Sequence, residues 1–153
     1  MAYDIDDSIR SLFSKGYKKI DISLLHMLND SILETQANGH EIIYFSGKFI
    51  GERIVSNHIK KHPKNNIIDI LKYTLRKLNI GNIAGIRVKK DMITLDIDDC
   101  VFYKKRRNSK NCYFMLGIIA GMATEISGKN YFGKFVRFKN SKRNTCVFAV
   151  RRK

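Results

Sequence analysis

Apolar residues recur at helical spacing in five segments of the chain. Positions three and four residues apart lie on one face of a helix, so these segments are predicted helices. They cover about 4–14, 22–37, 47–61, 67–78 and 111–127. Each is followed by residues that end helices, because glycine and asparagine accept a left-handed backbone and proline lacks an amide hydrogen. These residues are Gly16, Asn38-Gly39, Pro63, Gly81 and Gly128.

Strand patterns occupy the rest of the chain. Segments 84–89 and 92–102 flank a Lys90-Asp91 turn, and segments 131–139 and 145–151 flank a turn at 140–144. Apolar residues alternate most clearly at Ile93, Leu95 and Ile97, which predicts a sheet with one buried face. A short stretch at 40–45 predicts a further strand or extended arm.

The order of these segments predicts an α+β fold. Strands that are grouped in hairpins and separated from helices form an antiparallel sheet, here of about four strands, with helices packed against it. The chain has 153 residues, so one domain over 1–153 is expected, with 1–20 as an N-terminal helical extension. The hydrophobic fraction of 44% is sufficient for an ordinary core.

The most apolar segment, 113–126, is too short and too interrupted by polar residues and glycine to span a membrane. The acidic start of the chain, 1–7, lacks the positive charge and apolar run of a secretory signal. Three cysteines are too few for a secreted disulfide scaffold. A cytoplasmic location is therefore expected.

Positive charge is concentrated in the last third of the chain. The net charge is +15, and residues 101–153 contain 14 Lys/Arg and a single acid, Glu125. This asymmetry indicates either an anionic partner, such as nucleic acid or a membrane surface, or a solvated lysine-rich surface. The segment 135–139 matches the end of the main RNA-recognition-motif signature, but Tyr131 and Phe132 stand where that motif requires a basic residue and a glycine. Nucleic-acid binding is the alternative function.

Small residues mark the helix at 111–127. Gly117 and Gly121 are four residues apart there, and Gly47 and Gly51 form a similar pair earlier in the chain. Such pairs let another backbone approach closely or leave room for a ligand. Plain core packing is the other interpretation of the apolar face beside them.

Catalytic motifs are absent from the sequence. It contains no G-x-x-x-x-G-K-[ST], G-x-G-x-x-G or G-x-S-x-G segment. His58 and His62 are spaced for a metal, but no glutamate stands between them. Asp96 and Asp98 alternate with apolar residues, as on the wet face of a sheet. A non-enzymatic protein is expected.

Two groups of residues resemble a known family, the 4-vinyl reductase domain, in particular its stand-alone archaeal members. The first group is Tyr44-x-x-Gly47-x-x-x-Gly51. The second is Cys112, Gly117, Gly121, Gly128 and Cys146-x-Phe148-x-Val150. The resemblance spans about 22–150. It implies the fold of small transport-particle tethering-complex subunits and a homodimer formed through helices.

The resemblance also implies a non-catalytic domain that binds or senses a small apolar ligand such as a hydrocarbon. Its pocket would lie between the helix at 111–127 and the final hairpin, and a separate effector protein would receive the signal. The expected ligand-binding residues are Tyr44, Tyr113, Leu116, Ile119, Ala120, Ala123 and Phe138. Nothing in the sequence supplies a reductant site, so the reductase activity in the family's name is not expected.

Some sensory members of the family hold a structural zinc. The pattern is a cysteine at the helix start, then Glu-x-x-Cys, then a cysteine on the last strand. Cys112 and Cys146 match its first and last positions, whereas the middle two fall near Phe135 and Phe138. The zinc site is therefore incomplete, and Cys100 is the candidate substitute for one missing ligand.

Overall fold

The structure is a computed structural model that describes residues 31–35, 37–61, 66–101, 112–139 and 143–153. The predicted helix at 4–14 and most of that at 22–37 lie outside the described residues, although 31–35 are helical. The described helices are α3 (Gly39–Lys61), α4 (Ile67–Lys77) and α5 (Cys112–Ser127). The described strands are β1 (Asn82–Lys89), β2 (Met92–Asp98), β3 (Tyr131–Lys139) and β4 (Thr145–Arg152).

The four strands form one antiparallel sheet in the order β1-β2-β4-β3, which confirms the predicted α+β class. Each hairpin supplies an edge strand and a central strand, and β2 pairs with β4 in the middle. On one face of this central pair, Ile97 lies opposite Cys146 and Leu95 opposite Phe148. These side chains are at most 1% exposed, and we call this face the inner face of the sheet.

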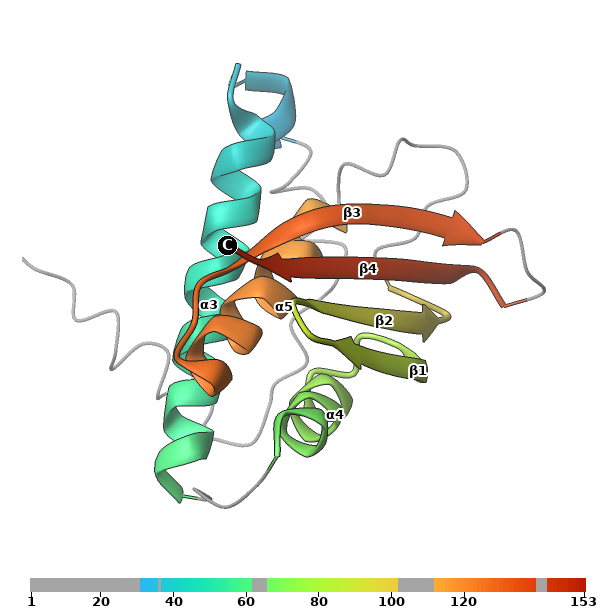
Figure 1. The fold of residues 1–153 in the computed structure, drawn as a ribbon. Helices are drawn as coiled ribbons and strands as arrows, with labels where there is room; N and C mark the ends of the chain where they lie inside the picture. Colours follow the sequence, from blue (N-terminus) through green and yellow to red (C-terminus); the bar gives the residue numbers. More distant parts are fainter. Residues whose placement is uncertain (1–30, 36, 62–65, 102–111, 140–142) are drawn as a thin grey trace, which may run out of the picture.

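Helix α5 lies between the inner face and α3, so the fold has three layers (Figure 1). It contacts β3 and β4 on one side and α3 on the other, while α4 packs near its side. A helix covered all round is apolar all round, which explains the sequence of α5. Its residues Met115–Ala123 are all buried.

The predicted strand at 40–45 is wrong, because these residues form the first turns of α3. The Asn38 carbonyl accepts hydrogen bonds from the amides of Glu41 and Ile42, which begins the helix. Neighbouring β-branched residues favour a strand locally, but packing against α5 overrides this weak preference. Within this stretch, the Tyr44 carbonyl oxygen lies directly against Gly117 of α5.

Local signals place several other boundaries. Asn66 accepts a hydrogen bond from the Asp69 amide and begins α4. Strand β2 ends at Asp98 instead of the predicted 102, because Asp99 takes a left-handed backbone with φ of 50°. Gly128, with φ of 64°, ends α5 as expected.

Candidate functional site

The glycine pairs of α3 and α5 bring the two helix backbones into direct contact. A Cβ atom on Gly117 would lie 2.0 Å from the carbonyl oxygen of Tyr44, and one on Gly121 would lie 2.0 Å from that of Lys48. Gly47 and Gly51 meet the α5 backbone in the same way. The space beside these glycines is thus filled by backbone. The glycine spacing therefore serves the close approach of two helices and leaves no room for a ligand there.

This close crossing positions Tyr44 against the start of β3. The Gly133 amide donates a hydrogen bond of 2.8 Å to the Tyr44 hydroxyl oxygen. Burial raises the pKa of Tyr44, the Gly133 hydrogen bond lowers it in part, and the negative charge of Glu52 adds to the rise. The phenol is therefore a neutral polar group within a largely apolar layer.

Gly133 also makes room for Leu116. A Cβ atom on Gly133 would lie 2.6 Å from the Leu116 Cδ2 atom and 2.9 Å from the Tyr44 ring. The strand register shifts between Gly133 and Phe135 at the same point. Sequence reasoning missed Gly133, although a glycine inside a strand pattern indicates a bulge or a close contact.

The structure brings together five of the seven predicted ligand-binding residues. Leu116, Ile119, Ala120 and Ala123 belong to the buried core, and Tyr44 packs against it. Tyr113 lies apart on the exposed side of α5, with its ring centroid 5.2 Å from that of His40. Phe138 lies five residues beyond Gly133 on β3, opposite Cys146, and is 39% exposed.

The three cysteines form a buried cluster at the start of α5. Cys112 is 0% exposed and hydrogen-bonds with both Cys100 and Cys146. These hydrogen bonds, and then burial, raise the pKa of the Cys112 thiol. The hydrogen bond with Cys100, together with burial, raises the pKa of Cys146 to about 12, although the bond with Cys112 lowers it in part. The thiols of Cys112 and Cys146 are therefore neutral near pH 7.

The residues present do not fit the zinc of the family's sensory members. Structural zinc is almost always held by four protein ligands. Among the described residues, the cluster offers three thiols that no carboxylate or imidazole joins. Within the described ranges, no group of three or more His, Cys, Asp or Glu side chains could hold a metal ion.

Thiol titration checks the cluster directly. With the folded pKa of Cys146 raised from 9.0 to about 12, its contribution to stability is complete below pH 9 and is lost as the pH rises through 12. We expect 5,5′-dithiobis(2-nitrobenzoate) at pH 8 to label the native protein far more slowly than the urea-unfolded protein, which should expose all 3 cysteines. Rapid labelling of the native protein would contradict the described burial.

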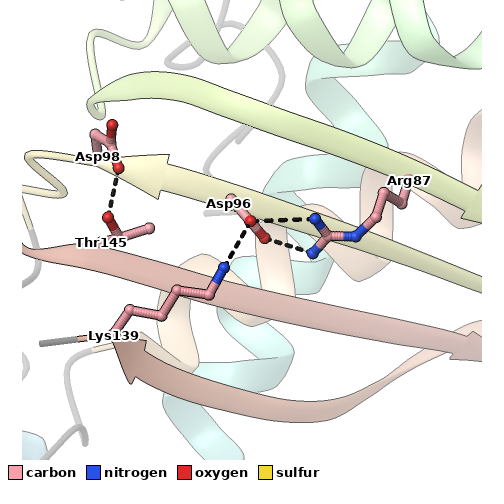
Figure 2. A network of polar contacts seen from close by, with 5 residues as sticks. All are labelled: Arg87, Asp96, Asp98, Lys139 and Thr145. Carbon is pink, nitrogen blue, oxygen red and sulfur yellow. Dashed lines mark hydrogen bonds and ion pairs between the residues drawn. The ribbon is translucent and has the colours of Figure 1, made fainter. Parts of the chain in front are cut away.

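A network of charged and polar side chains lies on the face of the sheet opposite α5 (Figure 2). Asp96 on β2 accepts hydrogen bonds from Arg87 on β1 at 2.7 Å and from Lys139 on β3 at 3.0 Å, the latter reaching across β4. Asp98 accepts a hydrogen bond from Thr145. Burial would raise the pKa of Asp96, but its two cationic partners outweigh this and lower it.

Acid unfolding tests the Asp96 interaction. Because the folded pKa of Asp96 is lowered, its stabilising effect is present above the unfolded value of about 3.9 and is lost as the pH falls through the folded value. We expect Asp96→Asn to reduce the urea midpoint at pH 7 and to have a much smaller effect at pH 2. An equal reduction at both pH values would show that the charge is not responsible.

None of the described helices is long and apolar enough to cross a membrane.

Comparison with known proteins places the fold. No protein-family model matches the sequence. An uncharacterized protein of Methanocaldococcus jannaschii is 26% identical over 104 residues, which are 67% of this chain and 58% of the relative. The chain therefore aligns with little more than half the length of that curated relative.

Three solved structures share the architecture. A vinyl-4-reductase family protein of M. jannaschii superposes with a TM-score of 0.63 at 18% identity, covering 100% of this chain and 99% of that one. The phenol-responsive sensory domain of the transcription activator PoxR, with phenol, superposes with a TM-score of 0.64 at 9% identity, covering 87% of this chain and 75% of that one. Subunit 3 of the trafficking protein particle complex from Naegleria fowleri, covalently bound to palmitic acid, superposes with a TM-score of 0.53 at 14% identity. The match covers 89% of this chain and 97% of that one.

These likenesses confirm, at the level of fold, the resemblance that the glycine and cysteine spacing indicates. The chain has the fold of the vinyl-4-reductase family protein, which it shares with a subunit of the trafficking particle.

Proposed function

We propose that this chain is a non-catalytic module that binds a small apolar molecule between α5 and the inner face of β3 and β4. The observation that carries the proposal is the Tyr44 hydroxyl, a single polar group positioned beside Leu116 and Gly133. Small-ligand sites are mostly apolar with a few placed polar groups, and this layer has that composition. The fold's likeness to a sensory domain with phenol supports the same function.

The ligand would take the place of the Leu116 side chain over Gly133. Leu116 is held there by side-chain contacts, which a change of rotamer can release, whereas the glycine crossing of α3 and α5 is fixed by backbone. Ile119, Ala120 and Ala123 would line the space on the α5 side. Tyr113 and Phe138 would remain outside this space, because both are partly exposed elsewhere.

Thermal unfolding with phenol and with palmitic acid tests the proposal. A ligand that binds only the folded state raises the melting temperature as its concentration rises. We expect Tyr44→Phe to weaken the phenol-induced rise, and Tyr73→Phe on the exposed side of α4 to leave it unchanged. If neither compound shifts the wild-type transition, the proposal loses its support.

We further propose that the module is a homodimer that signals to a separate effector protein. Ile42, Phe45 and Phe49 are spaced along one side of α3 and are 41%, 54% and 43% exposed. Large apolar side chains grouped in this way mark interaction surfaces.

Light scattering after size exclusion tests the dimer. We expect the double variant Phe45→Lys, Phe49→Lys to be a monomer, and Phe138→Lys on β3 to keep the wild-type mass. A monomeric wild type would contradict the dimer and would leave the ligand-binding proposal standing.

A further inference from the structure

The face of the sheet opposite α5 carries more basic than acidic side chains, and we call it the outer face. Paired residues of an antiparallel sheet lie on the same face, so the pairs Thr94–Ala149 and Asp96–Val147 define it. Five cations occupy the outer register positions of β1, β3 and β4. They are Arg87, Lys89, Arg137, Lys139 and Arg151.

The two acids on this face, Asp96 and Asp98, are already paired. Asp96 binds Arg87 and Lys139, and Asp98 accepts a hydrogen bond from Thr145 (Figure 2). The Asp98 Oδ2 atom also lies 3.9 Å from the Arg143 Nη1 atom. The side chains of Arg87 and Lys139 are still 54% exposed, and that of Arg143 is 74% exposed. The outer face therefore keeps an excess of positive charge that reaches solvent.

Large and largely exposed apolar side chains are missing from the described part of this face. Among the described side chains of the sheet, the large exposed hydrophobic ones are Val88 and Phe138. Their partners Ile93 and Cys146 place them in the inner register. Membrane-surface elements combine cations with apolar side chains that enter the lipid, so a phosphodiester backbone fits this face better than a bilayer. A flat sheet face, unlike a projecting helix, suits a single strand better than the major groove of a duplex.

A partly buried aromatic side chain, Phe132, lies in the outer register near the start of β3. Phe132 lies opposite Arg151 in the sheet register. The ammonium groups of Lys48 and Lys153 lie 4.3 and 5.0 Å from its ring centroid. Proteins that bind single strands combine aromatic rings with cations in this way.

We propose that the outer face binds single-stranded nucleic acid through its phosphates. This site is separate from the apolar site beneath α5 and does not depend on it. The cations of β1, β3 and β4 contact the phosphate backbone, and those that now pair with Asp96 are shared with it. The proposal gives the basic C-terminal third of the sequence a defined binding surface.

Fluorescence anisotropy with a labelled oligouridylate at low salt measures this binding. We expect the double variant Arg137→Gln, Arg151→Gln to weaken affinity about tenfold. The slope of log affinity against log salt concentration should become shallower by about 0.7 for each phosphate contact that is lost. The matched control Lys72→Gln, Arg76→Gln removes the same charge from the exposed side of α4 and is expected to change affinity less than about twofold. Melting temperatures of both variants check that they fold.

Asp96→Asn supplies a variant that acts in the opposite direction. It removes a negative charge and releases Arg87 and Lys139, so we expect tighter oligonucleotide binding despite lower stability. Three results would overturn the proposal: no binding by the wild type, equal losses in both charge-matched variants, or binding to phosphatidylserine vesicles without binding to the oligonucleotide. None of these outcomes affects the test of the apolar site, which is the phenol-induced rise in melting temperature and its loss in Tyr44→Phe.

Discussion

Gly117→Ala is expected to destabilise the protein by about 3 kcal/mol or more, at the upper end of what overpacking costs. The new Cβ atom would lie 2.0 Å from the Tyr44 carbonyl oxygen and 2.9 Å from the Lys48 amide nitrogen. Both atoms belong to the α3 backbone, so no side-chain movement relieves the clash and the helices must separate. Urea unfolding followed by circular dichroism measures the loss.

Whether Gly117→Ala lowers or raises the free energy of unfolding distinguishes a backbone contact from an exposed helix position. In an exposed helix, glycine to alanine stabilises by about 1 kcal/mol, because alanine is the better helix former. The control Gly85→Ala lies in β1, where an added Cβ would meet only atoms at 4.0 Å, and should leave the unfolding free energy nearly unchanged. A Gly117→Ala protein as stable as the wild type would show that α3 and α5 do not cross in backbone contact.

Leu116→Ala is expected to cost about 2–5 kcal/mol, the range for truncating a buried leucine. Leu116 is 4% exposed and fills the space over Gly133 beside the Tyr44 ring. Its truncation leaves an apolar cavity next to one hydroxyl group, which suits a phenol-sized molecule. The variant should therefore be less stable alone, yet its melting temperature should rise more with phenol than that of the wild type.

Leu75→Ala is the matched control, because Leu75 is 1% exposed but lies in α4, away from Tyr44. It should lose comparable stability. Its phenol-induced shift should match that of the wild type. Equal shifts in the two leucine variants would mean that phenol enters any apolar cavity, and the space under Leu116 would have no special role.

The strand pairs and α5 could be predicted because their signals are local. Alternation at Ile93, Leu95 and Ile97 and the turns that follow each strand are visible in the sequence itself. The helical start of α3 could not be predicted, since residues 40–45 are extended by local preference and are helical where the Tyr44 backbone packs against Gly117 of α5. The conformation of residues 40–45 is therefore set by the contact between α3 and α5, which the local sequence does not reveal.

The candidate site was predictable in part for the same reason. The face of Leu116, Ile119 and Ala120 follows from helical spacing, and all three side chains are buried in the structure. The contact of Gly133 with both Leu116 and Tyr44 joins three separate elements, and no spacing rule encodes it. Cys100 likewise meets Cys112 only because of the path taken by the chain after β2.

The central claim is that a small apolar molecule binds between α5 and the inner face of the sheet. Methyl nuclear magnetic resonance of protein labelled at Ile, Leu and Ala, titrated with phenol, tests it most directly. The account predicts that the methyl signals of Leu116, Ile119 and Ala120 shift together and saturate with the ligand. Saturable shifts confined to methyl groups outside this layer, or no shifts at all, would contradict it.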